Sequence, residues 1–255
     1  MQMKERQSKD TPVLSCSIIT FNEERIIEKT LSSIHNWVDE IIVVDSFSTD
    51  NTINILEMFN VKLFQQKWDG YSKQKNYAVS KCTGDWILVL DADEVISEKL
   101  KAEIVKAIKN PGLNTGFSIP RKLYIGKKWI KYGGYYPDYQ LRLFKKNAKA
   151  EFLQRAVHES ISLNGKVGYL KNPLEHYAYT SINDYKKSLN DYGVLASKEI
   201  KNKTYYLPLL RAAWSFLFRY IFRLGFLEGK LGFNLAKAYS QYVFKKYNLA
   251  MEKMS

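Results

Sequence analysis

Two carboxylates, Asp91 and Asp93, directly follow an apolar run in the stretch WILVLDADE, residues 86–94. The run is short and lacks helical spacing, so it predicts a central strand of a buried sheet. Open α/β sheets bind ligands where strands end, and two adjacent carboxylates there suit a hard divalent cation. The alternative is an acidic turn before a helix, because helix N-termini also favour acids.

Two further polar segments come at the ends of predicted strands. TFNEE covers residues 20–24, and DSFSTDNT covers residues 45–52. Three polar segments at equivalent strand ends favour a shared ligand crevice over three unrelated loops.

Strands and helices alternate over the first part of the chain. Strands are predicted at residues 14–20, 40–45, 61–65 and 86–90. Helices are predicted at about 22–34, 50–59 and 72–81, and a fourth runs from its cap Ser97 to Asn110-Pro111-Gly112. This alternation predicts βαβ units around a mostly parallel central sheet, an α/β fold.

The alternation stops after Gly116. Short extended pieces rich in aromatic residues and glycine then predict antiparallel strands, and helices return from about Ser181. We expect four regions. They are a polar tail (1–12), an α/β half (13–112), an α+β half (113–180) and a basic amphipathic helical extension (181–255).

The chain is strongly basic, and much of its positive charge lies near the C-terminus. The 255 residues carry a formal net charge of +13, and residues 181–255 hold 13 Lys and Arg against 5 Asp and Glu. Clustered positive charge indicates nucleic acid, an anionic membrane or a phosphorylated substrate, unless it serves only solubility. Acidic strand ends would repel a nucleic-acid backbone at the ligand edge, so we expect no nucleic-acid partner.

Sequence features also suggest a compartment. Cys16 and Cys82 lie in apolar segments and indicate neither a disulfide framework nor a zinc site. The N-terminal residues MQMKERQSKD lack the apolar region of a signal peptide, and no apolar run approaches the ~18 residues of a membrane span. We therefore expect a cytoplasmic protein.

Residues 207–226, LPLLRAAWSFLFRYIFRLGF, predict an amphipathic helix. Arg211, Ser215, Arg219 and Arg223 recur every four residues and form one polar stripe, while apolar side chains fill the other faces. A basic stripe on an aromatic helix suits an anionic membrane surface, here the inner face of the cytoplasmic membrane. A helix packed on its own domain or in a homodimer is the alternative.

The ordered set SIITFNEE, VVDSFSTDNT and GDWILVLDADE resembles glycosyltransferase family 2, inverting enzymes with a GT-A nucleotide-sugar fold. The motifs PDYQLRLF and VHESI, with the basic aromatic C-terminus, resemble small members that glucosylate the lipopolysaccharide inner core. The resemblance implies that residues 13–112 bind a nucleotide sugar and that residues 113–180 form the acceptor side.

The resemblance also implies roles for residues on the donor side. Thr20, Phe21, Asn22 and Glu23 match the loop that receives the nucleobase, and Asp45 matches an acid that binds the base or ribose.

Four further positions complete the implied donor site. Asp91 matches the first acid of the DXD motif, near the ribose and metal, and Asp93 matches the second, the principal ligand of Mg²⁺ or Mn²⁺. Lys73 resembles a position near the nucleotide. Arg142 would pair with phosphate or, alternatively, with a nearby carboxylate.

Inverting transfer needs a general base on the acceptor side of the sugar. Asp138 is the best match for it, although Pro137 stands where the family usually has Glu. Glu159 is the competing base, and His158 would contact the diphosphate or the metal.

The implied activity is metal-dependent transfer of a hexose, with glucose from UDP-glucose favoured, to a lipid-linked glycan such as the lipopolysaccharide inner core. A polyprenyl phosphate, a polypeptide or another surface polysaccharide are alternative acceptors. A nucleotidyltransferase is the alternative outside glycosyl transfer, but such enzymes usually carry a Gly-rich basic loop after the first strand, and TFNEE has no glycine.

Overall fold

The computed structural model describes residues 12–153, 160–198, 200 and 207–252. These residues form two compact units. The first unit contains residues 12–120, 139–153 and 160–174, and the second contains residues 121–138 and the described residues from 175 onward. The predicted catalytic candidates His158 and Glu159 lie outside the described residues.

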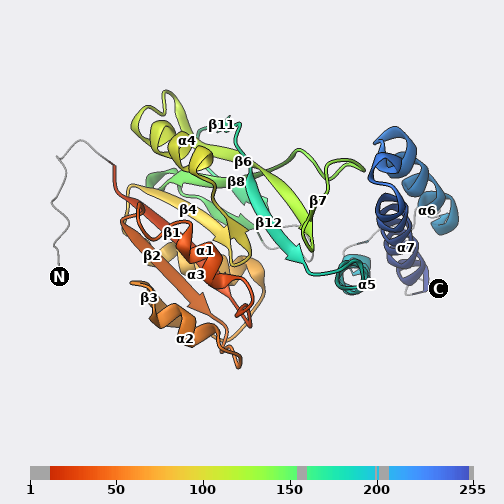
Figure 1. The fold of residues 1–255 in the computed structure, drawn as a ribbon, viewed down its shortest axis with the longest axis horizontal. Helices are drawn as coiled ribbons and strands as arrows, with labels where there is room; N and C mark the ends of the chain where they lie inside the picture. The colour runs from red at the N-terminus through yellow and green to blue at the C-terminus, as the bar shows by residue number, and fades with distance from the viewer. Residues whose placement is uncertain (1–11, 154–159, 199, 201–206, 253–255) are drawn as a thin grey trace. The chain divides into compact units, whose positions relative to one another are not determined.

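Alternating strands and helices build the start of the first unit. In chain order they are β1 (Leu14–Thr20), α1 (Ile27–Ser32), β2 (Glu40–Asp45), α2 (Thr52–Glu57), β3 (Lys62–Gln65), α3 (Tyr71–Lys81), β4 (Trp86–Asp91), β5 (Glu94–Val95) and α4 (Glu98–Lys109). Strands β3, β2, β1 and β4 are neighbours in this order and pair in parallel, as the red-to-yellow strands of Figure 1 show. The apolar runs of β1, β2 and β4 are almost wholly buried, as expected for strands covered on both faces.

Antiparallel pairing extends this sheet beyond β4. The elements that follow α4 are β6 (Asn114–Ile125), β8 (Asp138–Lys145), η1 (Lys146–Ala148), β9 (Glu151–Leu153), β10 (Ser160–Ser162) and β11 (Lys166–Tyr169). Strand β8 pairs antiparallel with β4, and β6 follows β8 in the sheet. Strand β11 adds to β6 in parallel, whereas β9 and β10 form a separate two-stranded sheet. The predicted α/β fold, with an α+β part after Gly116, is therefore confirmed.

Helices dominate the second unit. Its elements include the end of β6, β7 (Lys128–Trp129), β12 (Leu174–Tyr179), α5 (Ile182–Ser197), α6 (Pro208–Leu217), the π-helical turn η2 (Phe218–Phe222), the 3₁₀ turn η3 (Gly225–Glu228) and α7 (Lys230–Glu252). Helix α7 packs against both α5 and α6, and Figure 1 shows α6 and α7 side by side. A Cβ on Gly232 would lie 1.9 Å from the Gly225 carbonyl oxygen, so only glycine allows this approach of α7 to η3.

The helix predicted from residue 22 starts later, at Ile27. Asn22 has a positive φ of 54°, which is outside the helical region. The N–H groups of Asn22 and Glu23 donate instead to the Ser48 and Thr52 hydroxyls, at 2.9 and 2.8 Å. Contacts between loops therefore replace the first helical turn.

The helix predicted over residues 207–226 breaks after Leu217. In η2 the N–H of Arg223 donates to the Phe218 carbonyl, five residues earlier, at 2.8 Å. This wider turn interrupts the four-residue stripe. Arg211 and Arg223 are exposed, whereas the guanidinium carbon of Arg219 lies 3.5 Å from the Tyr239 ring centroid. Within the described residues, no helix has both the length and the apolar character to cross a bilayer.

Candidate active site

Three loops leave the first unit's sheet at one edge. The register of β1 opposes Thr20 to Asp45 of β2, and Ile19 to Asp91 of β4. Because the three strands are parallel, the segments TFNEE, DSFSTDNT and DADE follow neighbouring strand ends. The sheet therefore brings the predicted donor-side motifs together.

Hydrogen bonds join the first two loops. The Asn22 side-chain oxygen accepts the Thr49 N–H at 2.8 Å, while Ser48 accepts the Asn22 N–H. Further along, the Glu24 carboxylate accepts the Asn51 N–H at 2.8 Å. Side chains of each loop thus satisfy backbone donors of the other, so the two loops form one structure.

The carboxylate of Asp45 holds the turn of the second loop. Asp45 is fully buried and accepts the Ser48 N–H at 2.8 Å and the Ser48 hydroxyl. Its role in binding the base or ribose stays a prediction. Thr20 is also buried, and its hydroxyl has no hydrogen-bond partner among the described residues.

Two exposed aromatic rings stand on these loops. Phe21 is 52% exposed, and Phe47, with a positive φ of 62°, is 53% exposed. Phe21 was among the predicted site residues, and Phe47 was not, although an aromatic residue between two serines in a polar loop is a sequence signal for it. Exposed rings on hydrogen-bonded loops offer flat faces for a nucleobase.

A buried charge cluster fixes Asp91. Its carboxylate is bonded by the Arg142 guanidinium and lies 2.7 Å from the Lys75 ammonium. Arg142 also contacts Glu94 at 2.6 Å, and the second oxygen of Glu94 accepts the Asp91 N–H at 3.0 Å. Burial lowers the pKa of Arg142, but Asp91 and Glu94 outweigh burial and raise it above its ordinary value.

This cluster bears on the predicted roles of Arg142 and Lys73. Arg142 forms ion pairs with carboxylates, the alternative that the sequence left open, and its contact with phosphate stays a prediction. Lys75, which the sequence analysis did not select, is 5% exposed and reaches Asp91, whereas the predicted Lys73 is exposed and pairs with Asp69 at 2.6 Å. A lysine among buried positions of α3 needs a carboxylate partner, and the sequence alone does not identify it.

Negative charge accumulates beside Asp93. The pKa of Glu23 is raised to about 7, mainly by burial and next by the Asp93 carboxylate, while Arg25 opposes the shift. Asp50 and Asp91 contribute in the same direction as Asp93. A cation bound at Asp93 would relieve this repulsion, so the residues present fit the predicted divalent metal.

The protein alone supplies few ligands for such a metal. Among the residues that the structure describes, no three carboxylate, imidazole or thiolate groups are grouped to hold an ion. Mg²⁺ is commonly bound by one or two carboxylates together with substrate phosphates. A site of that kind, with Asp93 as the protein ligand, is compatible with these surroundings.

Asp138 belongs to the second unit and is its predicted base. The Arg121 guanidinium binds its carboxylate through Nε at 2.9 Å and through Nη2 at 2.6 Å. Two hydrogen bonds from one guanidinium fix the orientation of the carboxylate.

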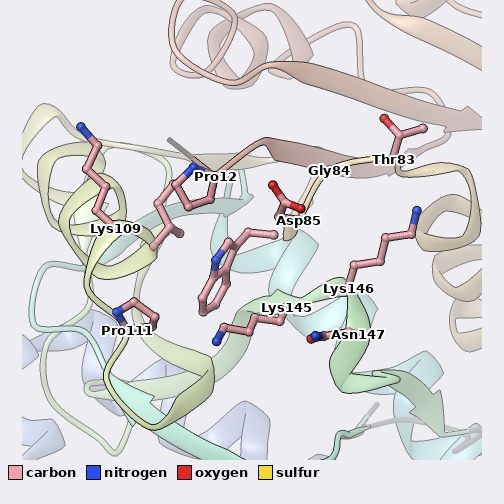
Figure 2. A pocket seen from close by; sticks show the side chains of 11 residues that line it. Pro12, Thr83, Gly84, Asp85, Lys109, Pro111, Lys145, Lys146 and Asn147 are labelled. Atoms are coloured by element: carbon pink, nitrogen blue, oxygen red, sulfur yellow. The ribbon is translucent and has the colours of Figure 1, made fainter. Parts of the chain in front are cut away.

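A cavity of about 830 Å³ lies elsewhere in the first unit (Figure 2). Its lining includes Pro12, Asp85, Lys109, Lys145 and Lys146. These residues surround the beginnings of β1 and β4, whereas Asp91 ends β4. The cavity contains no predicted site residue, and we assign it no part in the chemistry.

Comparison with known proteins gives consistent matches. The family model described as Glycosyl transferase family 2 matches residues 15–177. An uncharacterized glycosyltransferase of Rickettsia typhi is 31% identical over 234 residues, which cover 86% of this chain and 80% of the relative. The lipopolysaccharide core biosynthesis glycosyltransferase LpsC of Rhizobium meliloti is 30% identical over 165 residues, which cover 61% and 59% of the two chains.

A solved structure has a similar fold. The mannosyltransferase PcManGT from Pyrobaculum calidifontis, in complex with GDP-Man and Mn²⁺, matches with a TM-score of 0.56 and 14% identity. The match covers 96% of this chain and 88% of that chain. At this identity the likeness concerns the fold alone.

The substitution Glu23→Gln tests whether ionisation of Glu23 destabilises the folded protein. An unfolded Glu loses its proton near pH 4.5, whereas Glu23 in the folded protein does so at about 7. Because the pKa of Glu23 is higher in the folded than in the unfolded protein, ionisation of Glu23 destabilises the fold. The free energy of unfolding is therefore unaffected by Glu23 below about pH 4.5 and falls as the pH rises to about 7. Across that window we expect the free energy of unfolding of the parent to fall by about 1–2 kcal/mol more than that of Glu23→Gln, allowing for solvent screening.

Urea unfolding at a series of pH values measures this difference. Glu57→Gln, at an exposed position of α2, is the matched control and should follow the parent. Parallel pH profiles for the parent and Glu23→Gln would contradict the assignment.

Proposed function

We propose a donor, an acceptor and catalytic roles for this chain, which belongs to glycosyl transferase family 2 and is a glycosyltransferase enzyme with the GT-A fold. The proposed reaction is inverting transfer of a hexose from a nucleotide sugar, with UDP-glucose as the first donor to test. The proposed acceptor is a lipid-linked glycan such as the lipopolysaccharide inner core. Because the chain belongs to this family, the alternative of a nucleotidyltransferase is ruled out.

The observation that carries the donor proposal is the arrangement of three loops at one sheet edge. The hydrogen-bonded pair of loops presents Phe21 and Phe47, and β4 ends there with Asp91 held by Lys75 and Arg142. A preformed aromatic surface beside acidic side chains suits a nucleoside diphosphate with its metal. The proposed nucleotide contacts are those of Thr20, Phe21, Asn22, Glu23, Asp45, Lys73 and Arg142.

Asp93 is the proposed metal ligand, with Asp91 beside it. Bound Mg²⁺ or Mn²⁺ would supply charge stabilisation for the departing diphosphate. Since Lys75 and Arg142 already neutralise Asp91, its proposed part is to orient the DXD turn, and Asp93 provides the charge for the cation. The Mn²⁺ in the mannosyltransferase similar in fold supports a divalent ion in this role.

Asp138 is the proposed general base. It would take the proton of the acceptor hydroxyl as that oxygen attacks the anomeric carbon, and the bond from that carbon to the diphosphate oxygen would break. Arg121 supports this role because its two hydrogen bonds hold the carboxylate in one orientation. Glu159 and His158 remain the alternative candidates.

Similarity to LpsC, a lipopolysaccharide core biosynthesis glycosyltransferase, supports a glycan acceptor of the lipopolysaccharide core. The remaining candidates are a polyprenyl phosphate, a polypeptide and another surface polysaccharide. Each differs from the core in charge and in sugar content, so acceptor assays distinguish them.

We also propose that the chain is cytoplasmic and binds the inner face of the cytoplasmic membrane through α6 and η2. The aromatic face, defined as Trp214, Phe218 and Phe222, is a set of exposed rings in mutual contact. Arg223 lies over the Phe218 ring at 5.4 Å, and Arg211 is exposed on α6. Aromatic rings beside cations suit the interface of an anionic membrane.

Calorimetric titration with UDP, GDP and ADP tests the donor proposal, each in Mn²⁺, in Mg²⁺ and in EDTA. We expect UDP to bind best, and its affinity to fall at least about tenfold in EDTA and in Asp93→Asn, because both changes remove the cation. Glu57→Gln should bind as the parent does. If no nucleotide binds, the donor proposal is refuted. If UDP affinity is unchanged in EDTA and in Asp93→Asn, the proposed metal site is refuted.

Asp138→Asn tests the base. The amide retains the shape of the carboxylate but accepts no proton, so we expect kcat for transfer to fall by about 10²- to 10⁴-fold while UDP affinity is unchanged. Asp191→Asn, at an exposed position of α5, is the control. Normal kcat in Asp138→Asn would move the role to another residue, with Glu159 tested next.

Vesicle sedimentation tests the membrane proposal. We expect binding to phosphatidylglycerol-containing vesicles, but not to pure phosphatidylcholine, and at least about tenfold weaker binding by Trp214→Ser/Phe222→Ser because two apolar anchors are lost. Leu113→Ser removes an exposed apolar side chain of the first unit and should bind normally. A parent that is dimeric by light scattering, with a monomeric double variant, would instead assign this face to a homodimer.

A further inference from the structure

One face of the β6–β7 hairpin gathers aromatic rings. Tyr124 of β6 is the direct partner of Trp129 of β7, so their side chains share a face of the hairpin. The Tyr124 ring stacks on Tyr177 of β12, with 4.7 Å between centroids and 18° between planes. Tyr136 contacts Trp129 edge-on at 5.4 Å. These four rings, with Lys122 and Lys131, are called the hairpin face below.

Two lysines converge on the same indole ring. The Lys122 ammonium lies 4.6 Å from the Trp129 ring centroid, and the Lys131 ammonium lies 6.0 Å from it. Lys131 also lies 5.4 Å from the Tyr132 ring. Neither ammonium forms an ion pair with a carboxylate in the described part of the chain. Two like charges held around one ring repel each other, and an anion between them would turn this repulsion into attraction.

The opposite side of the same hairpin is electrically different. Arg121 is paired with Asp138, and Lys128 is paired with Glu228 at 2.9 Å. Alternation along β6 places Arg121 on the other side from Lys122, and the partnership of Ile125 with Lys128 places Lys128 with Arg121. The hairpin thus carries ion-paired cations on one side. On the other side Lys122 and Lys131 lie among aromatic rings, where the Glu175 carboxylate accepts the Tyr177 hydroxyl at 2.8 Å.

The backbone that carries Lys131 is fixed in place. The Glu228 carboxylate, largely buried, accepts the N–H of Lys131 at 2.8 Å and that of Tyr132 at 3.1 Å. The Arg219 guanidinium then donates to the Gly133 carbonyl at 2.8 Å. A cation on a segment held this firmly loses little freedom when it binds a ligand, which favours recognition over a merely solvated charge.

Trp129 also has an unused donor. Its indole N–H is buried and has no acceptor among the described residues. An unsatisfied buried donor is costly, and ligand oxygens commonly satisfy such groups at binding sites. A sugar hydroxyl or an oxyanion would provide such an oxygen.

We propose that the hairpin face is the acceptor subsite and that its ligand is an acidic sugar, one that carries a phosphate or a carboxylate. Lys122 and Lys131 bind the anionic group, and the aromatic rings pack against the apolar face of the sugar. The inference rests on the proposed glycosyl transfer and gives the acceptor a chemical class. It excludes neutral glycans as the preferred acceptor.

Nuclear magnetic resonance of the ¹⁵N-labelled chain tests this proposal. The probe is deacylated lipopolysaccharide inner-core oligosaccharide, before and after enzymatic removal of phosphate. We expect saturable movement of the Trp129 indole resonance, which Trp129→Phe identifies by its disappearance. Lys122→Gln/Lys131→Gln should weaken binding at least about tenfold, and added salt should weaken parent binding. Lys127→Gln, an exposed residue of the same hairpin, should bind as the parent does.

The probe forms distinguish the two anions. Binding lost on dephosphorylation assigns phosphate, and binding retained but still dependent on the two lysines assigns carboxylate. Binding equal in the parent and the double lysine variant, or no movement of the Trp129 resonance, would overturn the proposal. Circular dichroism checks that the variants fold. UDP titration of the same samples distinguishes failure of the acceptor subsite from failure of the proposed function. UDP binding without oligosaccharide binding refutes this subsite alone, whereas absence of both also refutes the proposed function.

Discussion

The guanidinium of Arg142 balances two carboxylates at the point where β4 leaves the sheet. Asp91 and Glu94 stand three residues apart in a turn, and Glu94 is fully buried. Without a cation between them, the turn would carry uncompensated charge in a region shielded from water. Arg142 comes from β8, which pairs antiparallel with β4, so the same strand that closes the parallel sheet supplies the charge for its acidic end.

Patterns confined to short stretches predicted most of the first unit. Apolar runs over residues 14–20, 40–45 and 86–90 are strands because a sheet covered on both faces needs continuous apolar sequence. The polar segments at their ends followed from the same reasoning. The start of α1 did not, because a helical pattern is visible from residue 22 while the hydrogen bonds that displace it come from residues 48 and 52.

The residues that sequence analysis missed have partners far along the chain. Lys75 is buried against Asp91, sixteen positions later. Phe47 is the exception, since its place between two serines in a polar loop was a local signal. Arg219 belonged to a predicted surface stripe, yet its guanidinium stacks on the Tyr239 ring of α7. Such outcomes depend on tertiary contacts, which local periodicity does not contain. For the same reason the C-terminal region, which reads as an appendage in sequence, supplies Glu228 and Arg219 to the loop after β7.

The two loops that share hydrogen bonds through Asn22 and Ser48 have a consequence for how this chain changes over evolution. Each loop completes the other, so a substitution that reshapes one leaves backbone groups of its neighbour without partners. If these loops bind the nucleotide as proposed, a change of nucleotide preference requires compensating substitutions in both. Grafting either segment alone would remove hydrogen-bond partners of the other, so the two segments must be exchanged together.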